Sequence, residues 1–214
     1  MPKSSIAIVN AGGSNISSLT FALDRIKASY ITTNQIAQIE DSSHVILPGV
    51  GAANDAMDKL KKSNLIEVVR NLKQPTLGIC LGMQLLLDHS MENNVNCLSI
   101  IEGRCKAFSQ QDKCPVPHMG WNNVNFNKPS PLTEDLDNDD YFYFVHSYYC
   151  APDNEDDIVA SVNYGIDFTA VVQRNNIYGV QFHPESVLTP HGPALMANFL
   201  RQRAARRDGE AQHG

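Results

Sequence analysis

The chain has 214 residues, of which 43% are hydrophobic, and a formal net charge of −6. This length suits one sizeable domain, because single hydrophobic cores stop growing only near about 250–300 residues. No apolar run reaches the roughly 18 residues that a membrane-spanning helix needs. The single basic cluster, at residues 201–207, is typical of a solvated helix end rather than of a nucleic-acid-binding stripe.

The five cysteines are irregularly spaced and include no CxxC pair. This usage argues against a disulfide framework and against a structural zinc site. The N-terminus lacks the charged and apolar regions of a signal peptide. We therefore expect a cytoplasmic protein.

The first half of the chain alternates short β-branched runs with helical stretches, a pattern typical of parallel βαβ units. Asn15 is a candidate N-cap for the first helix. The expected strands cover 6–9, 44–47 and 76–80, and the expected helices cover 15–28, two segments through Met57 and Val68, and a stretch from about Met83.

The second half has shorter strands with alternating polarity, which indicates antiparallel additions to the parallel sheet. The prediction is an α/β fold with a mostly parallel central sheet, helices on both faces and antiparallel strand additions. We expect one domain over 1–205 and a disordered tail over 206–214. The expected elements of this half are strands at 104–108, 121–126, 141–149, 158–163, 168–173 and 177–182, and a helix at 193–203.

Gly78-Ile79-Cys80-Leu81-Gly82 has the spacing of a nucleophile between two glycines at a strand-to-helix turn. The glycines allow strand and helix to approach closely, since they carry no Cβ atom. A cysteine at the start of a helix is near free N–H groups, which favour its thiolate. The pattern predicts Cys80 as a nucleophile rather than a small buried side chain.

A cysteine nucleophile needs a base, and His183 is the first candidate among the seven histidines. It follows a strand-like run, and Pro184 favours an extended geometry that can bring Glu185 to the same side. A carboxylate there can orient the imidazole. His118 and His146 remain second candidates. No cluster has metal-ligand spacing and the glycine turn near residue 12 lacks nucleotide-binding motifs, so we expect no metal and no cofactor.

Three separated segments resemble those of the class I (triad) glutamine amidotransferases. They are Pro48-Gly49-Val50-Gly51, Gly78-Ile79-Cys80-Leu81-Gly82-Met83-Gln84 and Gln181-Phe182-His183-Pro184-Glu185. The resemblance implies a flavodoxin-like fold and a Cys-His-Glu triad formed by Cys80, His183 and Glu185. It also implies an oxyanion hole from the Val50 and Leu81 N–H groups, and L-glutamine binding by Gly51, Gln84, Ser147 and Tyr148.

Two further segments, 117–122 and 143–148, resemble the glutaminase subunits of imidazole glycerol phosphate synthase in histidine biosynthesis. That resemblance implies a heterodimer with a (β/α)8-barrel cyclase subunit. Ammonia would pass to the cyclase, which makes imidazole glycerol phosphate and aminoimidazole carboxamide ribotide. Asn15, Met119 and Trp121 match positions at the partner interface.

Other interpretations differ in the partner or in the substrate. The segment 185–192 resembles the glutaminase subunits of anthranilate and aminodeoxychorismate synthase, and 10–15 departs from the histidine-family pattern at its acid, aromatic and second glycine. A stand-alone cysteine hydrolase acting on γ-glutamyl substrates and a non-enzymatic interaction protein are further alternatives. Gln84 and the Pro48–Gly51 loop favour a free glutamine amide over the hydrolase.

Overall fold

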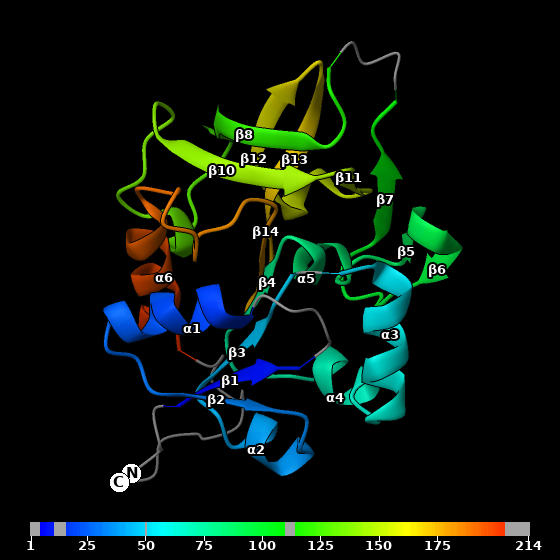
Figure 1. Cartoon of the computed structure of the whole chain (residues 1–214), viewed down its shortest axis with the longest axis vertical. Helices are drawn as coiled ribbons and strands as arrows, with labels where there is room; N and C mark the ends of the chain where they lie inside the picture. The colour runs from blue at the N-terminus through cyan, green and yellow to red at the C-terminus, as the bar shows by residue number, and fades with distance from the viewer. Residues whose placement is uncertain (1–4, 11–15, 50, 110–113, 204–214) are drawn as a thin grey trace, which may run out of the picture.

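The computed structural model describes residues 5–10, 16–49, 51–109 and 114–203. Within this part, a 12-stranded mixed sheet runs in the order β2-β1-β3-β4-β14-β13-β11-β7-β5-β6, with β12 and β9 extending from β13 (Figure 1). The neighbours from β2 to β14 are all parallel: β1 (Ile6–Val9), β2 (Tyr30–Thr33), β3 (His44–Leu47), β4 (Thr76–Ile79) and β14 (Ile177–Val180).

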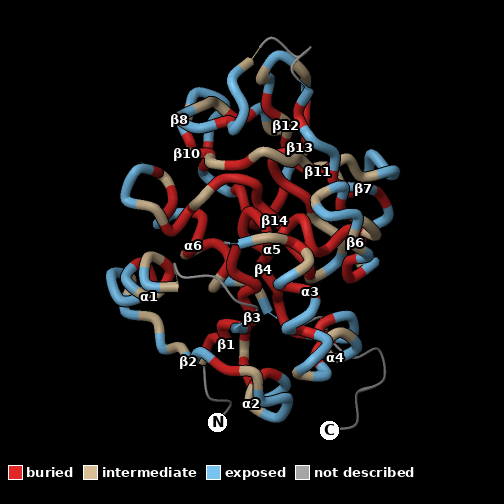
Figure 2. The backbone as a smooth tube through the Cα atoms, turned by 45° about the vertical axis from the view of Figure 1, so that its right-hand side comes forward, coloured by how far each residue is buried: buried red, intermediate tan, exposed pale blue. Residues whose placement is uncertain are grey.

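Helices cover both faces of the parallel part. Alternate residues of a strand point to opposite faces, so Ile6 and Ile8 pack in one core with α1 (Ile16–Arg25) and α6 (Gly192–Arg201). Their neighbours Ala7 and Val9 pack in the other core with the helices of the second face. Those helices are α2 (Ile36–Glu40), α3 (Ala53–Lys62) and α4 (Ile66–Arg70). The buried tube in Figure 2 runs along the strands between these layers. The predicted fold class is confirmed.

The other half of the sheet is largely antiparallel, and a separate two-stranded sheet crosses above it in Figure 1. That small sheet pairs β8 (His118–Asn123) with β10 (Tyr141–His146). The remaining elements are β5 (His89–Ser90), β6 (Val95–Asn96), β7 (Gly103–Ala107), β9 (Asn125–Phe126), β11 (Tyr148–Pro152), β12 (Ile158–Tyr164), β13 (Ile166–Arg174), α5 (Leu81–Gln84) and the 3-10 turns Glu92–Asn94, Pro131–Thr133 and Glu155–Asp157.

The observed elements differ from the expected ones in several places. The strand expected at 121–126 is divided between β8 in the small sheet and β9 in the large one. The helix expected from about Met83 is the single turn α5, which ends at Gln84. The strand expected at 141–149 breaks at Ser147, where the chain leaves the small sheet and enters the large one. The parallel strand β2 was not expected. The break matters for function because it turns Ser147 toward the cavity described below.

The helices of the described ranges are all too short or too polar to cross a membrane. The predicted disordered tail at 206–214 lies outside the described residues, as do Asn15 and Val50.

Candidate active site

Cys80 stands between the end of β4 and the start of α5, in a backbone conformation that few side-chain-bearing residues adopt. Its φ is 50° and its ψ is −105°, and its N–H donates to the Val180 carbonyl of the neighbouring strand at 2.7 Å. A Cβ atom on Gly78 would lie 2.6 Å from the backbone of Gly82, and one on Gly82 would lie 2.0 Å from the Leu47 oxygen. The elbow therefore requires glycine on both sides of the nucleophile.

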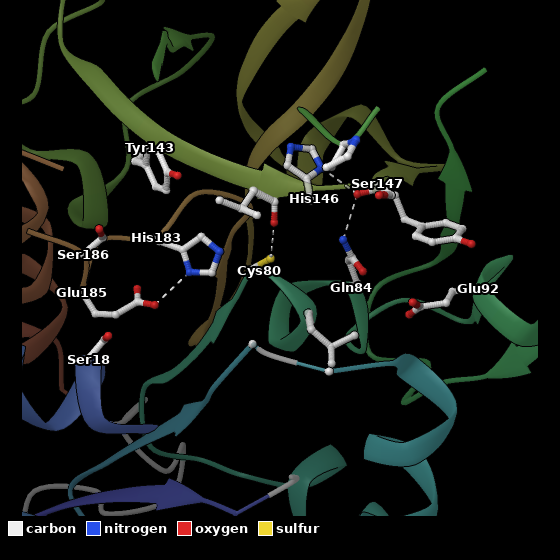
Figure 3. A pocket seen from close by; sticks show the side chains of 16 residues that line it. Ser18, Cys80, Gln84, Glu92, Tyr143, His146, Ser147, His183, Glu185 and Ser186 are labelled. Carbon is white, nitrogen blue, oxygen red and sulfur yellow. Dashed lines mark hydrogen bonds and ion pairs between the residues drawn. The ribbon is translucent and has the colours of Figure 1, made fainter. Parts of the chain in front are cut away.

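His183 and Glu185 follow β14, the parallel neighbour of β4. Because Ile79 and Val180 are paired in the ladder, the chain brings the residues after each strand to the same edge of the sheet. The Nδ1 atom of His183 donates to the Oε1 atom of Glu185 at 2.8 Å, and both side chains are largely buried. Figure 3 shows the imidazole between the carboxylate and the sulfur of Cys80.

The protonation state of His183 depends on opposing effects. Burial lowers its pKa, but the hydrogen bond and charge attraction from the Cys80 thiolate and from Glu185 outweigh burial and raise the pKa to about 11. His183 therefore holds a proton at neutral pH, and this is the proton that a leaving amine needs.

His118 and His146, the alternative bases, have a different environment. Their rings are buried and joined through Nδ1 of His118 and Nε2 of His146 at 3.1 Å. Burial lowers the pKa of His118 to about 4. Burial likewise lowers the pKa of His146 to about 3, against a smaller opposite effect of its hydrogen bond to Tyr148. Among the described residues, no carboxylate is hydrogen-bonded to either ring, so the geometry favours His183 as the base.

Leu81, the predicted oxyanion donor, is the first residue of α5, so its N–H has no acceptor within the helix. The Pro48–Gly51 loop lies against it, since a Cβ atom on Gly49 would be 2.6 Å from the Leu81 nitrogen and 1.7 Å from the Ile79 oxygen. Val50, the second predicted donor, lies outside the described residues. Gly49 therefore lies directly against the backbone on both sides of Cys80, where a side chain would not fit.

A cavity of about 520 Å³ lies over the elbow. It is lined by Cys80, His183 and Glu185, and also by all four predicted substrate residues, Gly51, Gln84, Ser147 and Tyr148. Gly51 has a φ of 111°, which favours glycine. The buried Gln84 side chain donates from Nε2 to the Tyr148 carbonyl at 2.9 Å. The cavity is the right size for a small polar substrate.

The predicted partner residues Met119 and Trp121 lie together on β8, on the face of the small sheet that also carries Tyr143 and Val145 of β10. Met119 is 62% exposed and Trp121 is 54% exposed. The Trp121 ring is 5.4 Å from the ring of Tyr143, a residue that lines the cavity. The exposed strand face therefore borders the cavity. Asn15, the third predicted partner residue, is outside the described part.

Sequence reasoning missed one polar residue beside the nucleophile. The Nε2 atom of Gln181 donates to the Sγ atom of Cys80 at 3.6 Å, and the Gln181 side chain has no exposed surface. The signal available was a glutamine inside the buried run that precedes His183, where polar side chains are rarely found without a partner.

The arrangement can carry out acyl transfer from an amide to a thiol. It has a nucleophile on a strained turn, a histidine oriented by a carboxylate, and at least one free N–H where an oxyanion would form. Among the described residues, no group of three or more histidine, cysteine or acidic side chains is arranged to hold a metal ion.

Comparison with known proteins agrees with this chemistry. Residues 7–203 match the family Glutamine amidotransferase class-I. The chain is 47% identical over 195 residues to "Imidazole glycerol phosphate synthase subunit HisH 2" of Legionella pneumophila, covering 91% of this chain and 96% of that one. It is 45% identical over 195 residues to the HisH subunit of Pasteurella multocida, with the same coverage.

A solved structure titled as a glutamine amidotransferase superposes with a TM-score of 0.71 at 17% identity, covering 91% of this chain and 96% of that chain, which shows a common fold. The expected family is confirmed by the sequence matches. The chain belongs to the class-I glutamine amidotransferases, in the family of the HisH subunits of imidazole glycerol phosphate synthase.

Proposed function

We propose that this chain hydrolyses L-glutamine to glutamate and ammonia, with Cys80 as nucleophile, His183 as acid and base, and Glu185 as the residue that orients His183. The observation that carries the proposal is their arrangement. Cys80 and His183 follow paired residues of two parallel strands and line one cavity, and Glu185 is hydrogen-bonded to the imidazole.

In this mechanism the Cys80 thiolate attacks the side-chain amide carbon of glutamine. The amide oxygen becomes an oxyanion, which the Leu81 N–H and the proposed Val50 N–H stabilise. His183 gives its proton to the nitrogen, the carbon–nitrogen bond breaks, and ammonia leaves a γ-glutamyl thioester on Cys80. Water then loses a proton to His183 and attacks the thioester, which releases glutamate and restores the thiolate.

The relatives are named as subunits of a synthase, so the chain works with a partner subunit. We propose that this partner is the (β/α)8-barrel cyclase subunit, which receives the ammonia and makes imidazole glycerol phosphate and aminoimidazole carboxamide ribotide in histidine biosynthesis. The exposed face of β8 supports this proposal, because an apolar surface beside the cavity lets a partner cover its mouth. A cytoplasmic location suits the free thiols of the described cysteines.

The test is the substitution Cys80→Ala in the complex with the cyclase subunit. We expect glutamine-dependent synthesis to fall to background, while synthesis from free ammonia stays near the wild-type rate, since the cyclase chemistry belongs to the other chain. Cys97→Ala, a change at a buried cysteine away from the cavity, is the matched control and should keep both activities. If free ammonia also failed to support the Cys80→Ala complex, the role as ammonia donor would be wrong.

A further inference from the structure

A chain of buried amide groups begins at the sulfur of Cys80, and the mechanism above does not use it. Gln181 is the first residue after β14, and its backbone N–H donates to the Ala170 carbonyl at 2.8 Å, which fixes its place at the sheet. Its Nε2 atom donates to the Cys80 sulfur. Its Oε1 atom accepts a hydrogen bond from the Nε2 atom of Gln84 at 3.2 Å.

The hydrogen-bond partners fix which atom of each side-chain amide, the nitrogen or the oxygen, faces which neighbour. The Tyr148 carbonyl can only accept, so the atom of Gln84 that faces it at 2.9 Å must be the amide nitrogen. That same nitrogen faces Gln181, which must therefore present its oxygen to Gln84. The nitrogen of Gln181 is consequently the atom turned toward Cys80. A flipped Gln181 would set two amide nitrogens against each other and an oxygen against the sulfur.

The Tyr148 carbonyl is held in turn by the two buried histidines. The Nδ1 atom of His146 donates to it at 2.8 Å, so the Nε2 atom of His146 is left as acceptor for the Nδ1–H of His118. His118 belongs to β8. The network therefore runs without a break from the small sheet to the nucleophile, and Figure 3 shows its part around Gln84 and His146.

The Cys80 sulfur also lies near the Val145 carbonyl, which interacts differently with a thiol and with a thiolate. The Val145 carbonyl lies 3.8 Å from Sγ and can accept from the S–H of a thiol, but it offers nothing to a thiolate. The N–H of Gln181 has the opposite preference, because a hydrogen bond to a charged acceptor is stronger than one to a neutral acceptor. Ionisation thus weakens one contact of the sulfur and strengthens the other.

We propose that Gln181 is a positioning residue that directs an N–H at the Cys80 sulfur and favours its thiolate, and that the Tyr148 carbonyl sets this direction through Gln84. This inference rests on the proposed role of Cys80 as nucleophile. The other titratable groups that face this region are His183 and Glu185 after β14, Tyr143 and His146 of β10, Tyr148 and Cys150 of β11, and Glu92. A substitution of Gln181 alone changes the identity of none of them.

The experiment follows the alkylation of Cys80 by iodoacetamide across pH in the full chain, quantified by mass spectrometry of the peptide that contains Cys80. In Gln181→Met, which keeps the length of the side chain but has no N–H, we expect the midpoint of the rate profile to move to higher pH. At pH values below the midpoint, the alkylation rate of the variant should be about tenfold lower than that of the wild type, and the plateau at high pH should be the same in both. A loss of access or of folding would instead lower the whole profile.

Gln74→Met is the matched control, since Gln74 is also a buried glutamine, but it lies in the bend before β4 and its amide donates to the Ile39 carbonyl, away from the cavity. It should leave the profile unchanged. An unmoved midpoint in folded Gln181→Met, or an equal shift in Gln74→Met, would overturn the inference. If Gln181→Met does not fold, Gln181→Asn gives the same test, because its shorter amide cannot reach the sulfur.

Glutamine hydrolysis by Cys80→Ala, measured in parallel, distinguishes a failure of the proposed function from a failure of the role proposed for Gln181. If Cys80→Ala keeps its activity, the proposed function of this site is wrong. If Cys80→Ala is inactive and the Gln181→Met profile equals that of the wild type, the role of Gln181 alone is wrong.

Discussion

His183 binds Glu185 through Nδ1, which leaves Nε2 as the nitrogen that can exchange a proton with Cys80 and with substrate. In the proposed mechanism the carboxylate orients the ring but takes no part in bond breaking. A triad of this kind loses most of its activity when its base is removed and less when its orienting residue is changed. The two residues should therefore differ in their contribution to the rate, although they lie only two positions apart.

We predict that His183→Asn lowers kcat for glutamine hydrolysis in the complex by roughly 10⁴-fold or more, nearly as much as loss of Cys80. The decrease in kcat for Glu185→Gln should be at least about tenfold smaller than that for His183→Asn, because an amide oxygen still accepts a hydrogen bond from Nδ1. Steady-state release of glutamate measures both, with ammonia-dependent synthesis as the control for assembly. Full activity in His183→Asn, together with inactive His118 or His146 variants, would reassign the base.

The candidate triad could be predicted from sequence because its signals are local. Two glycines mark Cys80, and a proline separates His183 from Glu185. The role proposed for Gln181 could not be predicted in the same way. That role depends on β14 lying beside β4, and the residues of neither strand indicate which strand is its neighbour. The pairing is a property of the sheet, so the contact to the sulfur becomes visible only in three dimensions.

At the scale of the elements, the small sheet of β8 and β10 contains two buried histidines, His118 and His146. His118 stacks on Tyr164 with ring centroids 3.9 Å apart and on Phe144 at 4.8 Å, and it hydrogen-bonds to His146. Both rings are neutral in the folded chain near neutral pH, because burial lowers their pKa values to about 4 and about 3. The ordinary value in an unfolded chain is about 6.5.

Below about pH 6.5 the unfolded chain therefore binds protons that the folded chain cannot, so the free energy of unfolding should fall as pH falls toward about 4. We predict that His118→Phe, which keeps the ring stacking, makes this fall less steep by up to ~1.4 kcal/mol per pH unit. Urea unfolding at several pH values measures the slope. Phe142→Leu, at a buried ring of β10 that packs on Phe126 and Phe182, should lower stability at every pH and leave the slope unchanged. Equal slopes in wild type and His118→Phe would contradict the prediction.

Two strands that are buried on both faces were predicted with their observed bounds, whereas the edge strand β2 was missed. β1 and β3 have the predicted bounds, because four consecutive buried residues give an unbroken apolar run. β2 lies at the edge of the sheet with two exposed residues, so Tyr30–Thr33 shows no such run. The helix expected after Met83 ends early although its residues are apolar. Leu85, Leu86 and Leu87 are buried in a turn, where packing overrides helix propensity.

On the scale of the whole molecule, exposed apolar residues lie both on β8 and in the loop after Glu185. The Nε1 atom of Trp121 donates to the Leu188 carbonyl at 2.6 Å, which joins the strand to the loop after Glu185. Val187, in the same loop, is 79% exposed. A partner seated on this surface would cover the cavity and also touch the loop that carries Glu185, so docking and catalysis would share their residues.

We predict that Trp121→Ala weakens binding of the cyclase subunit by at least about tenfold, since large aromatic residues at the centre of interfaces contribute most of the binding energy. Isothermal titration calorimetry measures the change, and circular dichroism checks that the variant is folded. Ile36→Ala is the control, because Ile36 is also exposed but belongs to α2, at the opposite end of the molecule in Figure 1. Wild-type affinity in Trp121→Ala would exclude this face as the interface.

The pairing of β4 with β14 has a consequence for how such subunits can diverge. The chain leaves the parallel ladder after α5 and returns to it in β14, directly beside the strand it left. Everything between is topologically an insertion, and it contains β8 and β10 with Met119 and Trp121. The exposed side chains of β8 can change while Ser147 and Tyr148 stay in the cavity and the ladder holds Cys80 near His183. The same catalytic sheet could therefore dock different partners through changes confined to the surface of the small sheet.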